Sequence, residues 1–243
     1  MTVLKGEGKV PILFGSMSIT VATRLRHGYL SRPDLAGEWP TVIVVPDVWG
    51  VSPSIKDLCR KLARRELASI AVDPFRDGGG RRFTDRAVAT TALAEVPAHD
   101  LDADLDDVAS FVANPAGFWS SAEHGLGVLG IGTGGAAAAR LADRRPGVAL
   151  ALVAAPLQPI AATLGPTSGL LGLYGRDDPE VPVEEVLAAR PALPQAELVL
   201  YEGVGSDFLD DGRPGYDLDA ATDAVERLTG FFIEHLPAAP AER

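Results

Sequence analysis

The chain has few side chains that commonly act as nucleophiles or general bases near neutral pH. Its 243 residues include four histidines and one cysteine, Cys59, which excludes an internal disulfide. Cys59 falls on an apolar helical stripe with Leu58 and Leu62, so we expect a buried small hydrophobe rather than a reactive thiol.

Positive charge is also scarce, with 22 Lys and Arg against 33 Asp and Glu and a net charge of −11. Such a chain lacks the basic surface that binds phosphate backbones or anionic lipid. No apolar run approaches the ~20 residues that a membrane span needs, and the first residues lack the apolar core of a signal peptide. We therefore expect a cytoplasmic protein that binds neither nucleic acid nor membranes.

What the chain does contain is alternating strand and helix patterns. With 47% hydrophobic residues, its length fits a single domain, residues 1–243. The β-branched run at 41–45 is typical of a buried central strand, whereas residues 16–24 alternate like a half-exposed edge strand that pairs with 27–30. Further strands are predicted at 68–75, 148–154, 170–174 and 198–201, and another apolar strand is expected to lead into the glycine-rich turn at 130–135.

Helices are predicted between these strands. Ser52 and Pro53 form an N-cap and a first helical position, opening a helix over about 53–67. Further helices are expected at 100–113 and 219–235, and the glycine-rich stretch 76–84 is predicted to be an irregular loop. This βαβ alternation predicts an α/β fold: a doubly wound, mostly parallel sheet with helices on both faces.

A glycine-rich turn at 130–135 joins an apolar strand to an Ala-rich helix. This is the context of a nucleophile elbow, in which a Ser or Cys is held at the turn. The nucleophile position is Gly132, which has no side chain and excludes the covalent step. It also predicts a positive φ at Gly132.

The same glycines match the dinucleotide pattern G-x-G-x-x-G. That pattern requires an acidic residue about 20 positions later, at the end of the next strand. The next strand ends in Ala154, Ala155 and Pro156. The dinucleotide reading is therefore disfavoured, and we expect no cofactor and no metal.

The loops after the strands carry four ordered motifs, and chemistry collects at this edge of such a sheet. They are PDVWGV at 46–51, GIGTGG at 130–135, DPEVP at 178–182 and YEGVGSDF at 201–208, and DDGRPGYD follows at 210–217. Together these segments resemble the dienelactone hydrolase family, whose blocks read H/Q-E/D-x-F/W-G-L, G-x-C-x-G-G, D-x-x-V-P and Y-x-G-x-x-H-x-F. The resemblance covers nearly the whole chain and implies an α/β-hydrolase fold.

The resemblance also implies roles for individual positions. The family's catalytic cysteine falls on Gly132, its aspartate on Asp178 and its histidine on Ser206. The first-loop carboxylate that pairs with the resting cysteine corresponds to Asp47. The acid position is thus retained, whereas the nucleophile and the base are replaced.

Further positions would shape the pocket. The backbone N–H groups of Val48 and Thr133 would be the oxyanion donors, and Trp49 would form a pocket wall. The family's substrate-binding arginine falls on Asp210, which inverts the charge. Among the histidines, His99 in the 76–100 insert is the one that could fold over the site.

Each retained polar residue also has a simpler explanation. Asp178 and Asp47 could merely order their loops by accepting backbone hydrogen bonds, and Ser206 could be an ordinary turn hydroxyl. We expect a non-hydrolytic protein that binds a small molecule, or acts on it without a covalent step, with a carbonyl- or carboxylate-containing ligand. The alternatives are a residual ester or lactone hydrolase of carboxymethylenebutenolidase type, and a structural or regulatory pseudoenzyme.

Overall fold

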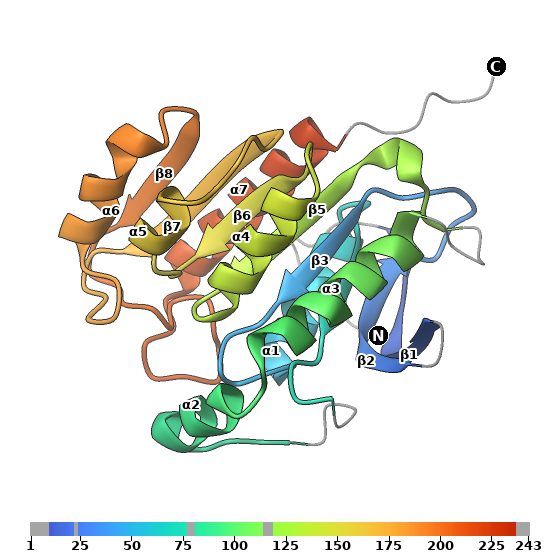
Figure 1. Ribbon diagram of the computed structural model, residues 1–243, viewed down its shortest axis with the longest axis horizontal. Coiled ribbons are helices and arrows are strands. Elements are labelled where there is room, and N and C mark those ends of the chain that lie inside the picture. Colours follow the sequence, from blue (N-terminus) through green and yellow to red (C-terminus); the bar gives the residue numbers. More distant parts are fainter. Residues whose placement is uncertain (1–9, 22–23, 77–80, 114–118, 237–243) are drawn as a thin grey trace.

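The protein is built around one mostly parallel sheet (Figure 1). The computed structural model describes residues 10–21, 24–76, 81–113 and 119–236. Within these residues the sheet has eight strands in the order β1-β2-β4-β3-β5-β6-β7-β8. The strands are Ile12–Val21, Arg24–Pro33, Thr41–Val45, Ala68–Val72, Leu126–Ile131, Ala149–Val153, Gly169–Gly175 and Ala196–Tyr201, numbered β1 to β8 along the chain.

The burial of each strand follows its place in the sheet. Strands β3, β4 and β6 are buried at every residue, as continuous apolar runs predict for central parallel strands. Strands β1 and β2 form an antiparallel hairpin, and β2 pairs antiparallel with β4. The predicted pairing of an edge hairpin is confirmed, but its turn lies earlier than predicted. Strand β1 ends at Val21 instead of residue 24, and Arg24 already begins β2.

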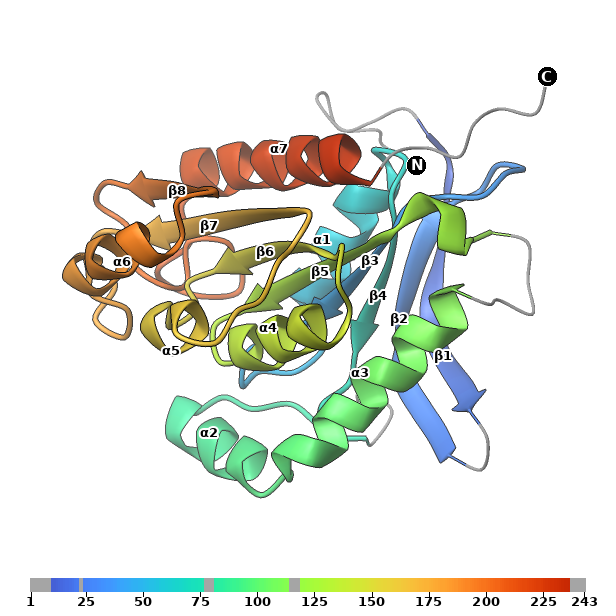
Figure 2. The same cartoon turned by 45° about the horizontal axis from the view of Figure 1, so that its top comes forward.

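Helices cover both faces of the sheet, as predicted (Figure 2). Helices α1 (Pro53–Ala63) and α7 (Leu218–His235) bury Leu62, Leu228 and Phe232 against one face. The other face packs against α3 (Ala98–Ala113), α4 (Gly134–Arg144), α5 (Gln158–Ala161) and α6 (Val183–Ala189). Cys59 lies in the first of these layers, where burial raises the pKa of its thiol to about 12, so the prediction of an inert buried cysteine is supported.

The ends of one helix and one strand differ clearly from the sequence prediction. Helix α1 begins as predicted, with Ser52 accepting a hydrogen bond from the Ile55 amide at 3.3 Å, but it ends at Ala63 because Arg64 to Glu66 turn the chain toward β4. Strand β4 ends at Val72 instead of residue 75. The predicted loop at 76–84 lies partly outside the described residues.

A further helix, α2 (Arg86–Ala94), was not predicted. Only Ala89 of this helix is buried, so it has little apolar periodicity to reveal it. Asp85 caps it by accepting a hydrogen bond from the Val88 amide at 3.0 Å. In Figure 2, α2 lies beside the first turns of α3, outside the helical layer formed by α4.

The described residues contain no helix that is long and apolar enough to cross a membrane.

A buried ion-pair cluster fixes α3, and with it the segment that carries α2. Asp104 is 1% exposed and pairs with Arg26 of β2 at 2.7 Å and with Arg76 after β4 at 2.6 Å. The two arginines come from segments far apart in the sequence. Arg26 also pairs with Asp107 at 2.9 Å and Arg76 with Asp100 at 3.0 Å, but Asp104 is the buried acid that both arginines share.

We predict that Asp104→Ala lowers the free energy of unfolding by about 2 kcal/mol, because the charged hydrogen bonds of a buried carboxylate are lost, while Asp107 and Asp100 still pair with the two arginines. Asp106→Ala is the matched control on the same helix. Asp106 pairs with Arg144 at 3.0 Å on the surface, and its loss should cost less than about 1 kcal/mol. Urea denaturation measures both, and equal losses would show that burial of the cluster is not what matters.

Candidate functional site

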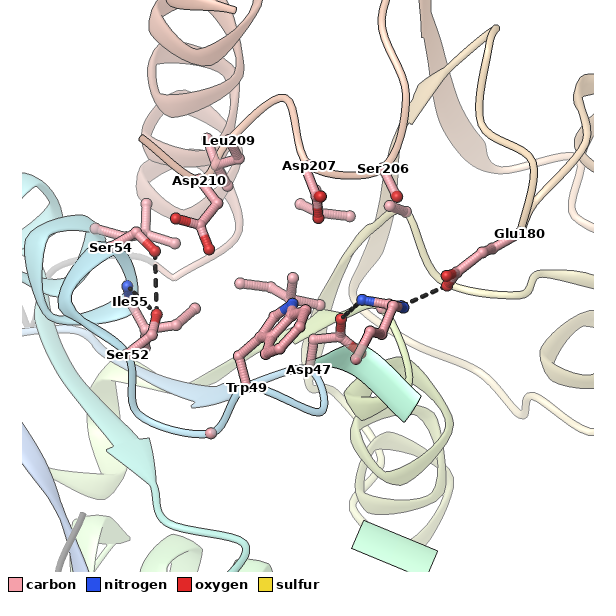
Figure 3. Close-up of a pocket in the computed structure, with 17 residues that line it drawn as sticks. Asp47, Trp49, Ser52, Ser54, Ile55, Glu180, Ser206, Asp207, Leu209 and Asp210 are labelled. Atoms are coloured by element: carbon pink, nitrogen blue, oxygen red, sulfur yellow. Dashed lines mark hydrogen bonds and ion pairs between the residues drawn. The ribbon is translucent and has the colours of Figure 1, made fainter. Parts of the chain in front are cut away.

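A pocket opens at the carboxyl ends of β3, β5 and β6, the edge at which the sequence places the site (Figure 3). About 610 Å³ of space lies between its walls and its open mouth, and part of this space is open solvent. Its described lining residues are Asp47, Trp49, Gly50, Ser52, Ser54, Ile55, Leu58, Arg86, Ile131, Gly132, Val153, Ala154, Glu180, Ser206, Asp207, Leu209 and Asp210.

The turn between β5 and α4 has the geometry of an elbow. Gly132 has a φ of +51°, as predicted, and its amide donates to the Val153 carbonyl at 2.9 Å. Helix α4 begins at Gly134, where a Cβ would lie 2.4 Å from the Val45 carbonyl oxygen. The glycines therefore let the helix start close against β3, and no side chain projects from position 132.

The carboxylate of Asp47 takes the space that a nucleophile would need. A Cβ built on Gly132 would lie 2.6 Å from both Cγ and Oδ1 of Asp47. The same Oδ1 accepts hydrogen bonds from the Thr133 amide at 3.0 Å and from the Thr133 hydroxyl at 2.8 Å. One of the two N–H groups expected to form an oxyanion hole is thus already engaged by Asp47.

Val48, which carries the other expected donor, is buried and does not line the pocket. Trp49 does line the pocket, as predicted. The guanidinium of Arg213 stacks on its ring, 3.4 Å from the ring centroid. This stack is a cation–π contact that holds the indole in place from the side of the last loop.

Arg86 is a pocket residue that sequence reasoning missed. It enters from the first turn of α2 and pairs with Oδ2 of Asp47 at 2.9 Å and with Glu180 (Figure 3). Burial disfavours its charged form, but Asp47 and Glu180 together raise the pKa of Arg86. The available signal was Asp85, a good N-cap residue directly before an arginine in the insert.

Asp178 orders the turn before α6. Its Oδ1 accepts hydrogen bonds from the Glu180 amide at 2.8 Å and the Val181 amide at 3.3 Å. Asp178 is 3% exposed, and among the described residues its Oδ2 has no hydrogen-bond partner. Burial raises the pKa of this carboxyl, and the two amide hydrogen bonds oppose that shift. Asp178 therefore does order its turn, and its participation in a reaction remains a prediction.

The last loop brings three polar side chains to the pocket: Ser206, Asp207 and Asp210. It lies beside the loop of Asp178 because Asp177 donates its amide to the Val204 carbonyl at 3.0 Å. The hydroxyl of Ser206 makes no hydrogen bond within the part of the chain that the structure describes. Ser206 thus occupies the expected position without a base to activate it.

None of the four histidines lines the pocket, all four being within the described ranges. The side chain of His99 is 84% exposed and lies 3.7 Å from Asp100. His27 is in the edge hairpin, His124 precedes β5 and His235 closes α7. The idea that His99 folds over the site is therefore wrong in this structure, because its side chain projects into solvent at the start of α3.

Comparisons with known proteins agree with this fold. The model of the dienelactone hydrolase family matches residues 27–236. A relative from Salmonella typhimurium is 32% identical over 225 residues, covering 85% of this chain and 82% of its own length. An Escherichia coli K12 relative is 32% identical over 242 residues, covering 92% and 88%. Both carry the name "Putative carboxymethylenebutenolidase".

A solved structure from Klebsiella pneumoniae, titled "Putative Dienelactone Hydrolase", superimposes with a TM-score of 0.81 at 30% identity, covering 92% of this chain and 99% of its own. The chain therefore belongs to the dienelactone hydrolase family. Its sheet, elbow and loop order are those that the sequence motifs predict.

We predict that Gly132→Ala lowers the free energy of unfolding by about 2 kcal/mol or more, because a Cβ must enter the left-handed region and also meet Asp47. Gly203→Ala is the matched control. Gly203 has a φ of +75° and open space around a built Cβ, so it carries the conformational cost alone. Adding Asp47→Ala to Gly132→Ala should recover the steric part. Equal melting temperatures for the two alanine variants would contradict the clash with Asp47.

Proposed function

We propose that this protein is a non-hydrolytic member of its family that binds a small molecule. The proposal rests on one observation at the elbow: the carboxylate of Asp47 fills the space that a side chain at position 132 would need. Acyl transfer through a nucleophile needs that side chain and a base within about 3 Å of it. Neither position 132 nor position 206 supplies such a group.

The electrostatics of the elbow favour binding over catalysis on a carbonyl. An oxyanion hole stabilises developing negative charge with N–H groups that are free to point at it. The Thr133 amide instead donates to Asp47, whose negative charge would repel an oxyanion. A substrate carbonyl could reach the Thr133 amide only if the Asp47 carboxylate moved away. Asp47 is fixed by its contacts with Arg86 and Thr133.

Residual hydrolysis of esters or lactones is the second candidate. The names of the relatives favour it, since both are described as carboxymethylenebutenolidases. Without a nucleophile the reaction would need direct attack by water, with a pocket carboxylate as the base. A structural or regulatory role is the third candidate, and a ligand retained on purification, detected by native mass spectrometry, would count against it.

For the purified protein we predict no burst and negligible turnover of p-nitrophenyl acetate. Loss of triad groups leaves at most a residual acceleration of about 10³ to 10⁴ over water from binding and an oxyanion hole, and the engaged Thr133 amide removes part of that. Stopped-flow absorbance measures the burst, and mass spectrometry detects an acyl adduct. A stoichiometric acyl-enzyme would refute the non-hydrolytic proposal.

Restoring the triad needs three changes because Asp47 fills the elbow. We predict that Gly132→Cys with Ser206→His, in an Asp47→Ala background, raises ester hydrolysis at least about 100-fold above either single change in that background, since thiol and imidazole act as one unit. Adding Asp178→Asn is the control and should remove most of the gain, because the amide orients the imidazole wrongly. If the folded variant gains nothing, positions 132 and 206 do not face each other.

A further inference from the structure

The charge of the pocket indicates which ligand it can take. Four carboxylates line it, those of Asp47, Glu180, Asp207 and Asp210, against one lining cation, Arg86. Arg213, which stacks on the ring of Trp49, adds a second positive charge close to the pocket. Even with both arginines counted, negative charge exceeds positive charge around the cavity.

Three of the four carboxylates already have partners. Arg86 binds Asp47 and Glu180. Asp210 accepts a hydrogen bond from the Gly212 amide at 2.9 Å, and its other oxygen lies 3.8 Å from Arg213. These contacts satisfy most of the charge that the pocket contains.

Asp207 is different. Among the described residues, its carboxylate makes no hydrogen bond and no ion pair. Figure 3 shows it on the last loop, between Ser206 and Asp210 and across the pocket from Asp47 and Trp49. Arg86 and Arg213 act on this carboxylate only at longer range. A half-buried carboxylate without a direct partner is costly, and a cation bound in contact with it would relieve that cost.

We propose that the ligand carries a protonated amine, and that Asp207 is the residue that pairs with it. This rests on the proposed binding function and adds the chemical class of the ligand. The remaining wall of Ile55, Leu58 and Ile131 is apolar and fits the carbon skeleton of such a molecule. The carboxylate-containing ligand expected from the sequence is thereby disfavoured, because it would face Asp207 and Asp210.

The electrostatics of Asp207 agree with this assignment. Burial raises the pKa of Asp207, with Arg86 and Arg213 opposing the shift and Asp210 and Asp47 adding to it. An ammonium group at this position would lower that pKa again, so binding should weaken as acid protonates the carboxyl.

The test uses three probes of one size: benzylamine, benzyl alcohol and benzoate, titrated at pH 7.5 and followed by two-dimensional NMR of the full chain. We expect benzylamine to bind at least about tenfold more tightly than the other two, with shifts at pocket residues. Asp207→Asn should abolish this preference. Asp211→Asn is the matched control. This substitution removes the same charge, but Asp211 is exposed and does not line the pocket.

The ranking of the probes on the unaltered protein already decides the ligand class, even if Asp207→Asn fails to fold. Tighter binding of benzoate or benzyl alcohol, or no binding of benzylamine, would overturn the proposal. An amine preference that survives Asp207→Asn, or that Asp211→Asn removes equally, would overturn the role of Asp207. These results are independent of the ester assays, so the amine proposal can fail while the non-hydrolytic proposal stands.

Discussion

The hydrogen bonds of Asp47 to Thr133, and its ion pair with Arg86, organise the whole functional edge of this molecule. Gly132 has no Cβ, so the carboxylate can lie against the elbow and reach the first amide of the turn into α4. The other oxygen, Oδ2, accepts a hydrogen bond from Arg86, and this contact ties α2 to the loop after β3. A side chain at position 132 would displace the Asp47 carboxylate and so break its contacts with Thr133 at the elbow and with Arg86 of α2.

That arrangement sets the electrostatics of the pocket. A carboxylate at the start of a helix is stabilised by the amide N–H groups there. The other oxygen of Asp47 pairs with Arg86, which also pairs with Glu180. Arg86 itself depends on α2, whose successor α3 is anchored by Asp104 against Arg26 and Arg76. A buried ion pair that does not line the pocket thus contributes to the position of the cation inside it.

Much of the fold could be predicted from the sequence. The run at 41–45 became β3 without change, because a continuous β-branched segment suits a strand that is buried on both faces. Ser52 and Pro53 marked the start of α1, since capping depends on neighbouring residues alone. The ends of α1 and β4 were predicted less well, because the tertiary contacts of the following turn decide where hydrogen bonding stops.

The sequence by itself determined what the site lacks: no side chain at Gly132 and no imidazole at Ser206, since residue identity and motif order suffice for both. Only the tertiary structure decided how the space is used. The partners of Arg86 lie 39 and 94 positions away in the chain, and no local pattern encodes such a meeting. Asp207 likewise cannot be distinguished from an ordinary loop residue in the sequence. Folding places it in the pocket without a direct hydrogen-bond or ion-pair partner among the described residues, because burial and pairing depend on segments that are distant in sequence.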